Sequence, residues 1–483
     1  MFSPPTDFLP PPLKNDIKSQ QQTNKRQLMT LSISSTSAFK NITPLLKPLL
    51  TLAGPVIASQ AASMMVNVAD TLMVSDLGDA PLAAISFTGN LFVPLMFLGI
   101  GMASTLTPLV GRRLGRGNIT DIAAIVAHAR KLNWCLSALL VSILLLLTVL
   151  VPFMGQPQEV VEMAQILLPL YAFSLLGQQM FVCSRTLIEG LQDTRSPMVI
   201  GIASNVLNII LNYVFIFGIG PYEGIGVYGA ALSTLIARIL MWLALEVVLR
   251  RRLRRMGIRP LTVRGHSLSL RLARIGLPLG LQSLAEAIGF ALAGIMIGWI
   301  SLEAIAAHQV VNLFCSLTYL MAGGLATAIT IKVSVSMGEG SHDVARRYAV
   351  AGISLAAIFM LCAALVLIVF RHHLPALFLH NDASLAIAAQ IMMVGGLFEL
   401  FDGLQVTTIG ALRGFADFAY PARVATLAFA LTSSPVGYVL AFVLGMGPSG
   451  IWFGMAAGLV LAAVLLLHRL RHKFFATQGI AVS

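Results

Sequence analysis

The sequence has 483 residues, of which 57% are hydrophobic and 11% charged, and a formal net charge of +12. Because a soluble globular domain carries about 25% charged residues, this composition excludes an ordinary soluble protein. The basic residues lie in loops between long apolar runs, which argues against a nucleic-acid-binding protein and indicates a polytopic helical membrane protein.

Residues 1–43 form a polar segment with "PPP" and "QQQ" runs, for which we expect disorder on the cytoplasmic side. No apolar stretch of the signal-peptide kind precedes the first long apolar run, so a cleaved signal is not expected. Met29 is an alternative start, in which case residues 1–28 are not translated.

Apolar segments then recur to the end of the chain, and each is long enough to cross a bilayer core of about 30 Å as a helix. We therefore expect an all-α integral membrane protein with about twelve transmembrane helices. The predicted spans are 44–75, 81–111, 124–152, 159–184, 197–218, 225–249, 273–300, 302–335, 345–370, 384–411, 420–445 and 450–468.

The charges between these spans predict the orientation. Nearly every Lys and Arg lies in or beside the N-terminal segment, the even-numbered loops or the C-terminal tail; Arg238, inside a span, and Arg371, in an odd-numbered loop, are the exceptions. The positive-inside rule then places both termini in the cytoplasm. The stretch "RRRLRRMGIR" at 250–259 is expected to contact anionic lipid headgroups.

The chain repeats itself at a shift of 223 residues, which matches Pro55 with Pro278 and Thr107 with Thr330. "GLQDTRSP" at 190–197 matches "GFADFAYP" at 414–421 in a similar way. We expect two six-helix lobes related by a pseudo-two-fold axis along the membrane normal, because an even number of spans gives both the same orientation. The expected parts are lobes at 44–250 and 272–470, a basic cytoplasmic linker at 251–271 and a tail at 471–483.

Acidic residues inside the spans are functional candidates, because a charge at the bilayer centre costs roughly 2.5–3.5 kcal/mol on insertion scales. Asp70, in "MMVNVADTLMVSDLG", follows Asn67 by one turn. Glu246 lies one turn from Arg250 and is expected to form an ion pair near the interface. The role of Arg238 stays open between neutralising an acid and pointing between helices.

Three further acids lie in the second half, namely Glu286, Glu399 and Asp402. Glu399 and Asp402 are three residues apart and share a helix face, where both carboxylates do not readily ionise together. The repeat pairs Glu286 with Ser63 and Asp402 with Gln178, so the acids are not part of a shared scaffold. We expect cation or proton binding here, although one isolated mid-span acid also fits a structural hydrogen bond.

Catalytic and energy-coupling motifs are not found in the sequence. It contains no G-x-x-x-x-G-K-[ST] phosphate loop, no G-x-S-x-G elbow and no H-E-x-x-H pair, so an enzyme or a cofactor is not expected and an ion gradient is the remaining energy source. His372, His373 and His380 share one outer loop, which fits either a metal site or a solvated surface. The four cysteines lie within spans, so no disulfide or metal is assigned to them.

Several stretches carry a family resemblance, among them "NVLNIILNYVFIFG", "GLPLGLQSLAEAIGF", "AAHQVVN" and "LFELFDGLQVTTIGALRGFADF". Over nearly all of residues 44–470 the chain resembles the multidrug and toxic compound extrusion (MATE) transporters, in their NorM-like branch. The resemblance implies two six-helix lobes around a central cavity. It also implies export of cationic amphipathic compounds in exchange for sodium ions or protons.

The resemblance also implies roles for single residues. Asp70, Glu286 and Asp402 match the acids of the first, seventh and tenth helices, which are expected to couple transport to a cation or proton, with sodium at Glu286 and Asp402. One departure is Ser75, where the motif usually has a glycine. The residues expected to line the cavity are Asn67, Gln178, Asn208, Asn212, Gln282, His308, Gln309 and Glu399.

The remaining expectations concern the partners and location of the protein and the alternative functions that its sequence allows. We expect a monomer in the bacterial cytoplasmic (inner) membrane, with drug-like substrates and no nucleic acid. A lipid-linked precursor flippase of related architecture is the alternative. Its cavity should be cationic to hold pyrophosphate, whereas the cavity expected here is acidic apart from Arg238. An integral-membrane enzyme is the third interpretation.

Overall fold

The structure is a computed structural model that describes residues 35–219, 222–258 and 267–476. The chain forms two compact units, one up to Lys47 and one from Pro48 onward. Helix α2 (Ser35–Ser75) begins inside the segment for which the sequence predicts disorder, since the stretch before Pro44 has neither glycine nor proline to stop a helix. Residues 1–34, the rest of that prediction, lie outside the described residues.

The described residues contain twelve helices or helix runs long and apolar enough to cross a membrane, as the sequence predicts. Six belong to the first half. After α2 come α3 (Asp79–Ala103), α4 (Leu106–Gly115), α5 (Ile119–Leu150), the 3₁₀ turn η2 (Val151–Met154), α6 (Gln158–Gly190), α7 (Arg195–Phe217), a short hairpin of β1 (Gly218–Ile219) and β2 (Tyr222–Glu223), and α8 (Val227–Arg255).

The second half contributes the other six spans, and its eleventh span is not a regular α-helix. The elements are α9 (Ser267–Gly298), α10 (Leu302–Gly338), α11 (His342–Val369), α12 (His373–Ala376), α13 (Asp382–Gly414), α14 (Ala419–Leu427), η3 (Ala428–Ser433), α15 (Ser434–Tyr438), η4 (Val439–Val443) and α16 (Pro448–Ala476). Both η3 and η4 are π-helical turns. Such turns often mark functional positions in a helix.

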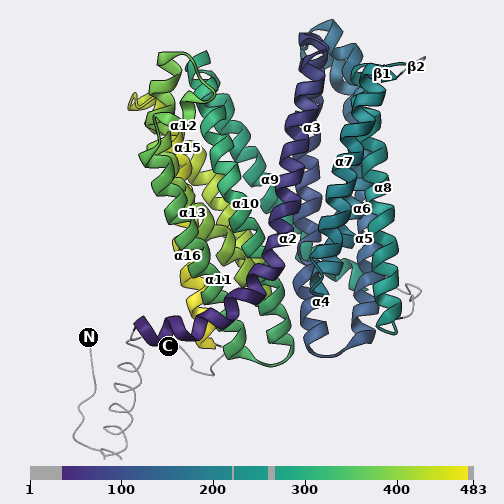
Figure 1. Ribbon diagram of the computed structural model, residues 1–483, viewed down its shortest axis with the longest axis vertical. Coiled ribbons are helices and arrows are strands. Elements are labelled where there is room, and N and C mark those ends of the chain that lie inside the picture. Colours follow the sequence, from purple (N-terminus) through teal and green to yellow (C-terminus); the bar gives the residue numbers. More distant parts are fainter. Residues whose placement is uncertain (1–34, 220–221, 259–266, 477–483) are drawn as a thin grey trace, which may run out of the picture. The chain divides into compact units, whose positions relative to one another are not determined.

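Each half packs mainly within itself. In the first half α6 packs against α3, α5 and α8, and in the second half α13 packs against α10, α11 and α16 (Figure 1). Small buried residues such as Gly396, in contact with Ile368, let α13 approach its neighbours closely. This close approach is how membrane helices associate without a hydrophobic driving force.

The repeat predicted from the sequence is visible in the hydrogen bonds. The Thr107 hydroxyl donates to the carbonyl of Thr186 at 3.0 Å, and the matching Thr330 hydroxyl donates to the carbonyl of Gly410 at 2.8 Å. The non-glycine residues Gln192 and Ala416 also occupy matching positions, with φ of 63° and 61°. Both stand just after the end of a long helix, where a left-handed residue stops the helix.

The two halves contact each other toward one end of the spans. This end, which we call the basic side, carries Arg112, Arg251 and Arg346. Here α4 packs against α10 and α3 packs against α9. A Cβ added at Gly115 would overlap the carbonyl oxygen of Val335 and lie 3.0 Å from the Cα of Gly338. Glycine therefore allows backbone-to-backbone contact between the halves.

Candidate functional site

The first-half acid, Asp70, lies near the C-terminal end of α2 and is held by a residue of another helix. The side-chain amide Nδ2 of Asn212, a buried residue on α7, donates to Asp70 Oδ1 at 2.5 Å. Asn67, one turn earlier on α2, is exposed and is not the partner. Asn208, also on α7, is buried and makes no hydrogen bond to Asp70. The sequence predicted these residues as a group, and the structure selects Asn212.

Arg238 on α8 lies in the interior of the first half. Its Nη1 donates to Ser174 Oγ on α6 at 2.9 Å, and its guanidinium lies over the Phe92 ring, 4.9 Å from the centroid. It interacts electrostatically with Asp70 but forms no ion pair with it among the described residues. Of the two roles left open by the sequence, the structure favours partial neutralisation of Asp70.

Two acids of the second half lie on facing helices. The amide Nε2 of Gln282 on α9 donates to Glu286 Oε1 at 3.0 Å, while the buried amide oxygen of Gln282 has no hydrogen-bond partner in the described part of the chain. Asp402 on α13 makes no hydrogen bond within the described residues. It interacts electrostatically with both Glu286 and Glu399. Asp402 therefore links the other two acids electrostatically, and Glu286 also interacts with Arg413 at the basic end of α13 without forming an ion pair.

Glu399 is set apart from the other two acids because it is fully buried, with 0% of its surface exposed. Its Oε2 contacts the hydroxyl of Thr318 on α10, and the Cys315 thiol lies beside the carboxyl. The sequence did not single out Thr318. The feature that could have pointed to Thr318 is its hydroxyl group beside a tyrosine within the apolar run "LFCSLTYLM".

Acids near the basic side differ from these four because arginine neutralises them. Glu246 accepts from Arg250 at 2.8 Å, as predicted, and also pairs with Arg130 at 2.6 Å. Asp417 pairs with Arg469 at 2.9 Å. Among the described residues, no such ion pair involves Asp70, Glu286, Glu399 or Asp402. Membrane-embedded acids without a basic partner are typical of ion and substrate pathways.

The remaining predicted residues have different surroundings. His308 is buried against Trp452, with ring centroids 5.6 Å apart, whereas the neighbouring Gln309 is exposed. Gln178 is half-buried and makes no hydrogen bond among the described residues. Its neighbour Gln179 is the buried one, and its amide donates to the carbonyl of Met96 at 3.0 Å. Gln179 joins α6 to α3.

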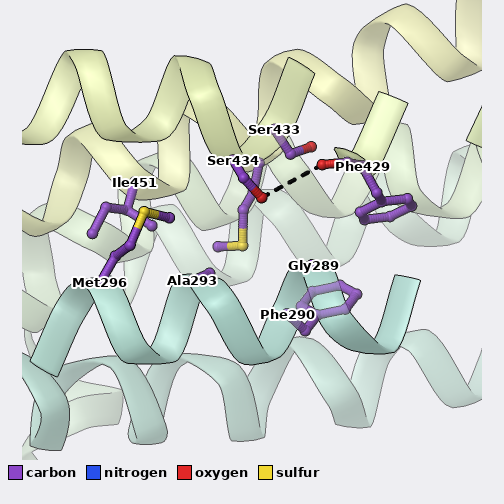
Figure 2. Close-up of a pocket in the computed structure, with 9 residues that line it drawn as sticks. Gly289, Phe290, Ala293, Met296, Phe429, Ser433, Ser434 and Ile451 are labelled. Atoms are coloured by element: carbon purple, nitrogen blue, oxygen red, sulfur yellow. Dashed lines mark hydrogen bonds between the residues drawn. The ribbon is translucent and has the colours of Figure 1, made fainter. Parts of the chain in front are cut away.

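A small pocket lies in the second half between α9, the π-helical turn η3, α15 and α16 (Figure 2). The lining side chains leave essentially no room for even a water molecule, whereas pockets that hold drug-sized ligands measure roughly 300–1,000 Å³. Phe290 and Phe429 face each other across it, and Ser434 donates to the carbonyl of Phe429 at 3.5 Å. This pocket does not fit a drug-sized ligand, although Glu286 stands one turn away on α9.

No group of three His, Cys, Asp or Glu side chains within residues 35–219, 222–258 and 267–476 is arranged to hold a metal ion. His372 of the outer loop instead pairs with Arg371, whose Nε lies 3.2 Å from the His372 ring nitrogen Nε2. His372, His373 and His380 are all exposed. A cation at Glu286 and Asp402 would have to take neutral oxygens as its further ligands.

A protein-family model matches most of the chain and identifies its family. The MatE model matches residues 55–214 and 278–439, one match in each half. The chain belongs to the MatE family. The two matched ranges begin at Pro55 and Pro278, the pair from which the internal repeat was recognised.

Relatives of this MatE protein are named as multidrug resistance proteins. A probable multidrug resistance protein NorM of Acinetobacter baylyi is 30% identical over 431 residues, which cover 88% of this chain and 95% of the relative. The multidrug resistance protein MdtK of Yersinia enterocolitica is 29% identical over 433 residues, with the same coverage of both chains. The chain is thus a multidrug efflux transporter of this family, and the flippase alternative is not favoured.

Solved structures support the fold of the MatE chain. An outward-facing MATE transporter of the MOP superfamily aligns with a TM-score of 0.82 at 20% identity, covering 90% of this chain and 97% of that one. The eukaryotic MATE transporter AtDTX14 aligns with a TM-score of 0.79 at 18% identity, covering 91% and 99%. At these identities the likeness shows the fold alone.

Proposed function

We propose that this MatE protein is a secondary antiporter that exports cationic amphipathic compounds in exchange for sodium ions or protons. The observation that carries the proposal is the contrast between two classes of acid. Acids near the basic side are paired with arginine, whereas Asp70, Glu286 and Asp402 have no ion-pair partner among the described residues. A cation or proton that relieves this electrostatic cost biases the arrangement of the two halves.

The second half suits sodium. A hard cation takes several oxygen ligands at once. Glu286 and Asp402 supply two carboxylates in one electrostatic environment, and the unpartnered amide oxygen of Gln282 lies one turn from Glu286. The first half suits a proton, which needs only one carboxyl group with a hydrogen-bond partner, and Asp70 with Asn212 provides that. We therefore assign sodium to the second half and a proton to Asp70.

Antiport follows if drug and coupling ion compete for the same charges. An ionised acid favours either a bound cation or a cationic drug, but not both together. A monomer suffices for this cycle, because each chain carries both halves. Expected surroundings are the bacterial cytoplasmic membrane, with the basic side and both termini in the cytoplasm.

Drug efflux from proteoliposomes with an imposed sodium gradient, at equal pH on both sides, tests the ion assignment. The sodium gradient should drive ethidium export by the wild-type protein. Glu286→Gln should remove this sodium-driven export, since it removes one of the two carboxylates. The matched comparison is Asp70→Asn, which changes the acid of the other half.

The opposite pattern would contradict the assignment. If export ignores sodium, follows a pH gradient, survives in Glu286→Gln and fails in Asp70→Asn, then the coupling ion is a proton bound in the first half.

A further inference from the structure

Glu399 is a buried acid that the proposed sodium site does not use. Its side chain has no solvent-exposed surface, and it lies on α13 where α10, α11 and α16 all pack. One turn earlier, Gly395 and Gly396 bring α13 close to Trp452 of α16 and Ile368 of α11. An ionised carboxylate in such surroundings would lose its hydration without a compensating partner.

Burial favours a neutral carboxyl group at Glu399, although the Thr318 hydroxyl and the Cys315 thiol are both able to donate to it. The single hydroxyl hydrogen of Thr318 has three acceptors within reach: the carbonyls of Phe314 and Cys315, at 3.3 and 2.9 Å, and Glu399 Oε2. A hydroxyl can donate one hydrogen and accept another. If Thr318 donates to its own helix, Glu399 must supply the hydrogen between the two side chains. Glu399 Oε1 has no hydrogen-bond partner among the described residues.

The groups facing Glu399 provide no compensating positive charge. From α10 come Thr318 and the Cys315 thiol, and on α13 itself Asp402 stands three residues on. From α9, Glu286 interacts with Asp402 rather than with Glu399. Beside this part of α13, α11 places Met360, Ala364 and Ile368, and α16 places Trp452. Within the part of the chain that the structure describes, the charge that changes near Glu399 is therefore the carboxylate of Asp402 or a cation bound to it.

We propose that Glu399 is a proton-binding site, which holds a proton while Asp402 is ionised and releases it when a cation binds at Asp402. This proposal depends on the proposed function in one respect, because cation binding at Asp402 is the event that causes Glu399 to release its proton. When Asp402 is ionised and unoccupied, its negative charge opposes a second carboxylate one turn away. A cation at Asp402 cancels that charge, and the O–H bond of Glu399 then breaks to give a carboxylate and a free proton. The second half thus exchanges a cation for a proton.

Infrared difference spectroscopy of the purified full chain in nanodiscs tests this directly. The wild-type protein without sodium should show the carbonyl stretch of a neutral carboxylic acid, and Glu399→Gln, which keeps size and polarity, should lack it. Adding sodium chloride in place of choline chloride, or adding ethidium, should diminish the band in the wild type. The same additions should release protons into a weakly buffered medium, and Glu399→Gln should lose this release.

Matched variants separate the proposal from a merely structural acid. Asp402→Asn removes the charge that opposes ionisation of Glu399, so it should diminish the band without any added cation and abolish the response to either cation. Glu162→Gln, which changes an exposed acid near the start of α6, should behave as the wild type. Thr318→Val should shift the carbonyl frequency because it removes the hydroxyl partner, whereas Thr318→Ser should not. These two variants also identify the band if Glu399→Gln cannot be purified.

Three outcomes would overturn the proposal. The first is a wild-type spectrum without the band, and the second is an unchanged band in Glu399→Gln. The third is a band that neither sodium nor ethidium alters, which would make Glu399 a permanently neutral structural acid. Failure of the proposed antiport would instead appear as normal ethidium export by Asp402→Asn. Export is measured separately from the infrared spectrum, so the two failures can be told apart.

Discussion

Asp402 and Glu286 illustrate how much the partner of a buried acid matters. Glu246 has two arginine partners and a hydroxyl contact from Ser184, so its charge is neutralised at a fixed place. Asp402 has none of these among the described residues, and its strongest neighbours are other acids. Without a bound cation, this group of neighbouring acids does not stabilise the folded protein. It gains stability only when a cation arrives, which is what a binding site requires.

Removing either of these two charges should therefore abolish export rather than folding. We expect Asp402→Asn and Glu286→Gln to reduce ethidium export at least tenfold, because a hydrogen bond or contact to a charged group contributes about 1.5–3 kcal/mol. Both variants should reach the membrane at normal abundance, since an amide costs less to bury than an unpaired carboxylate. Ethidium accumulation in a pump-deficient bacterium and membrane immunoblots measure the two effects.

The exposed acid Glu162, changed to Gln, is the control and should export at the wild-type rate. If Asp402→Asn and Glu286→Gln also export ethidium at the wild-type rate, the two carboxylates have a structural role and the proposed cation site is wrong.

At the scale of elements, the contact between α4 and α10 depends on glycine. A side chain at Gly115 would meet the backbone of α10, and overpacking of this kind costs about 1–3 kcal/mol. We therefore expect Gly115→Ala to disfavour the contact between the halves and to slow export. Gly89→Ala on α3 is the matched control, because nothing lies within 4 Å of a Cβ added there.

Cross-linking measures this effect. Lys332 of α10 donates to Gln192, which follows α6, at 2.9 Å, so cysteines at these two positions report contact between the halves. In a background without native cysteines, their cross-linking yield should fall in Gly115→Ala and stay unchanged in Gly89→Ala. Equal yields in both would mean that the glycine contact does not hold the halves together.

Comparison of the elements with the sequence shows what hydropathy can and cannot predict. The twelve spans were predictable because crossing a bilayer requires about 20 apolar residues, a strong local signal. The end of α6 was placed at residue 184, but the helix continues to Gly190 because Arg185 and Glu189 pair along it at 2.7 Å. Polar helix ends of this kind do not appear in a hydropathy profile.

The candidate residues of the site could be named from the sequence, but the contacts that these residues make could not. Asp70, Glu286, Glu399 and Asp402 were found because acids are rare and costly in apolar spans. Their partners were not predictable, because the contact of Asp70 with Asn212 joins positions 142 residues apart. The π-helical turn "AFALTS" in the eleventh span has no local sequence signal either, since its form depends on packing against α16.

For the whole molecule, the charge distribution predicts which side faces the cytoplasm. Single cysteines in the 250–271 loop should react only with membrane-permeant thiol reagents, whereas cysteines at 153–158 should react with impermeant ones from outside. The physical reason is the positive-inside rule acting on Arg250, Arg251 and Arg252. Labelling of whole cells, with the native cysteines replaced, is the measurement. The reverse pattern would invert every assignment of side made above.

The glycine contact between the halves also determines how that contact responds to force. Where Gly115 meets Gly338, backbone touches backbone without interlocking side chains. A gap of about 0.5–1 Å already removes a quarter to a half of the dispersion between such surfaces, whereas long side chains would stay in contact over several ångströms. The attraction between the halves at this contact therefore falls steeply with distance. The contact is either closed or open, and it offers little resistance once the two backbones have separated. A transporter whose two halves must never be open on both sides at once benefits from such an abrupt contact.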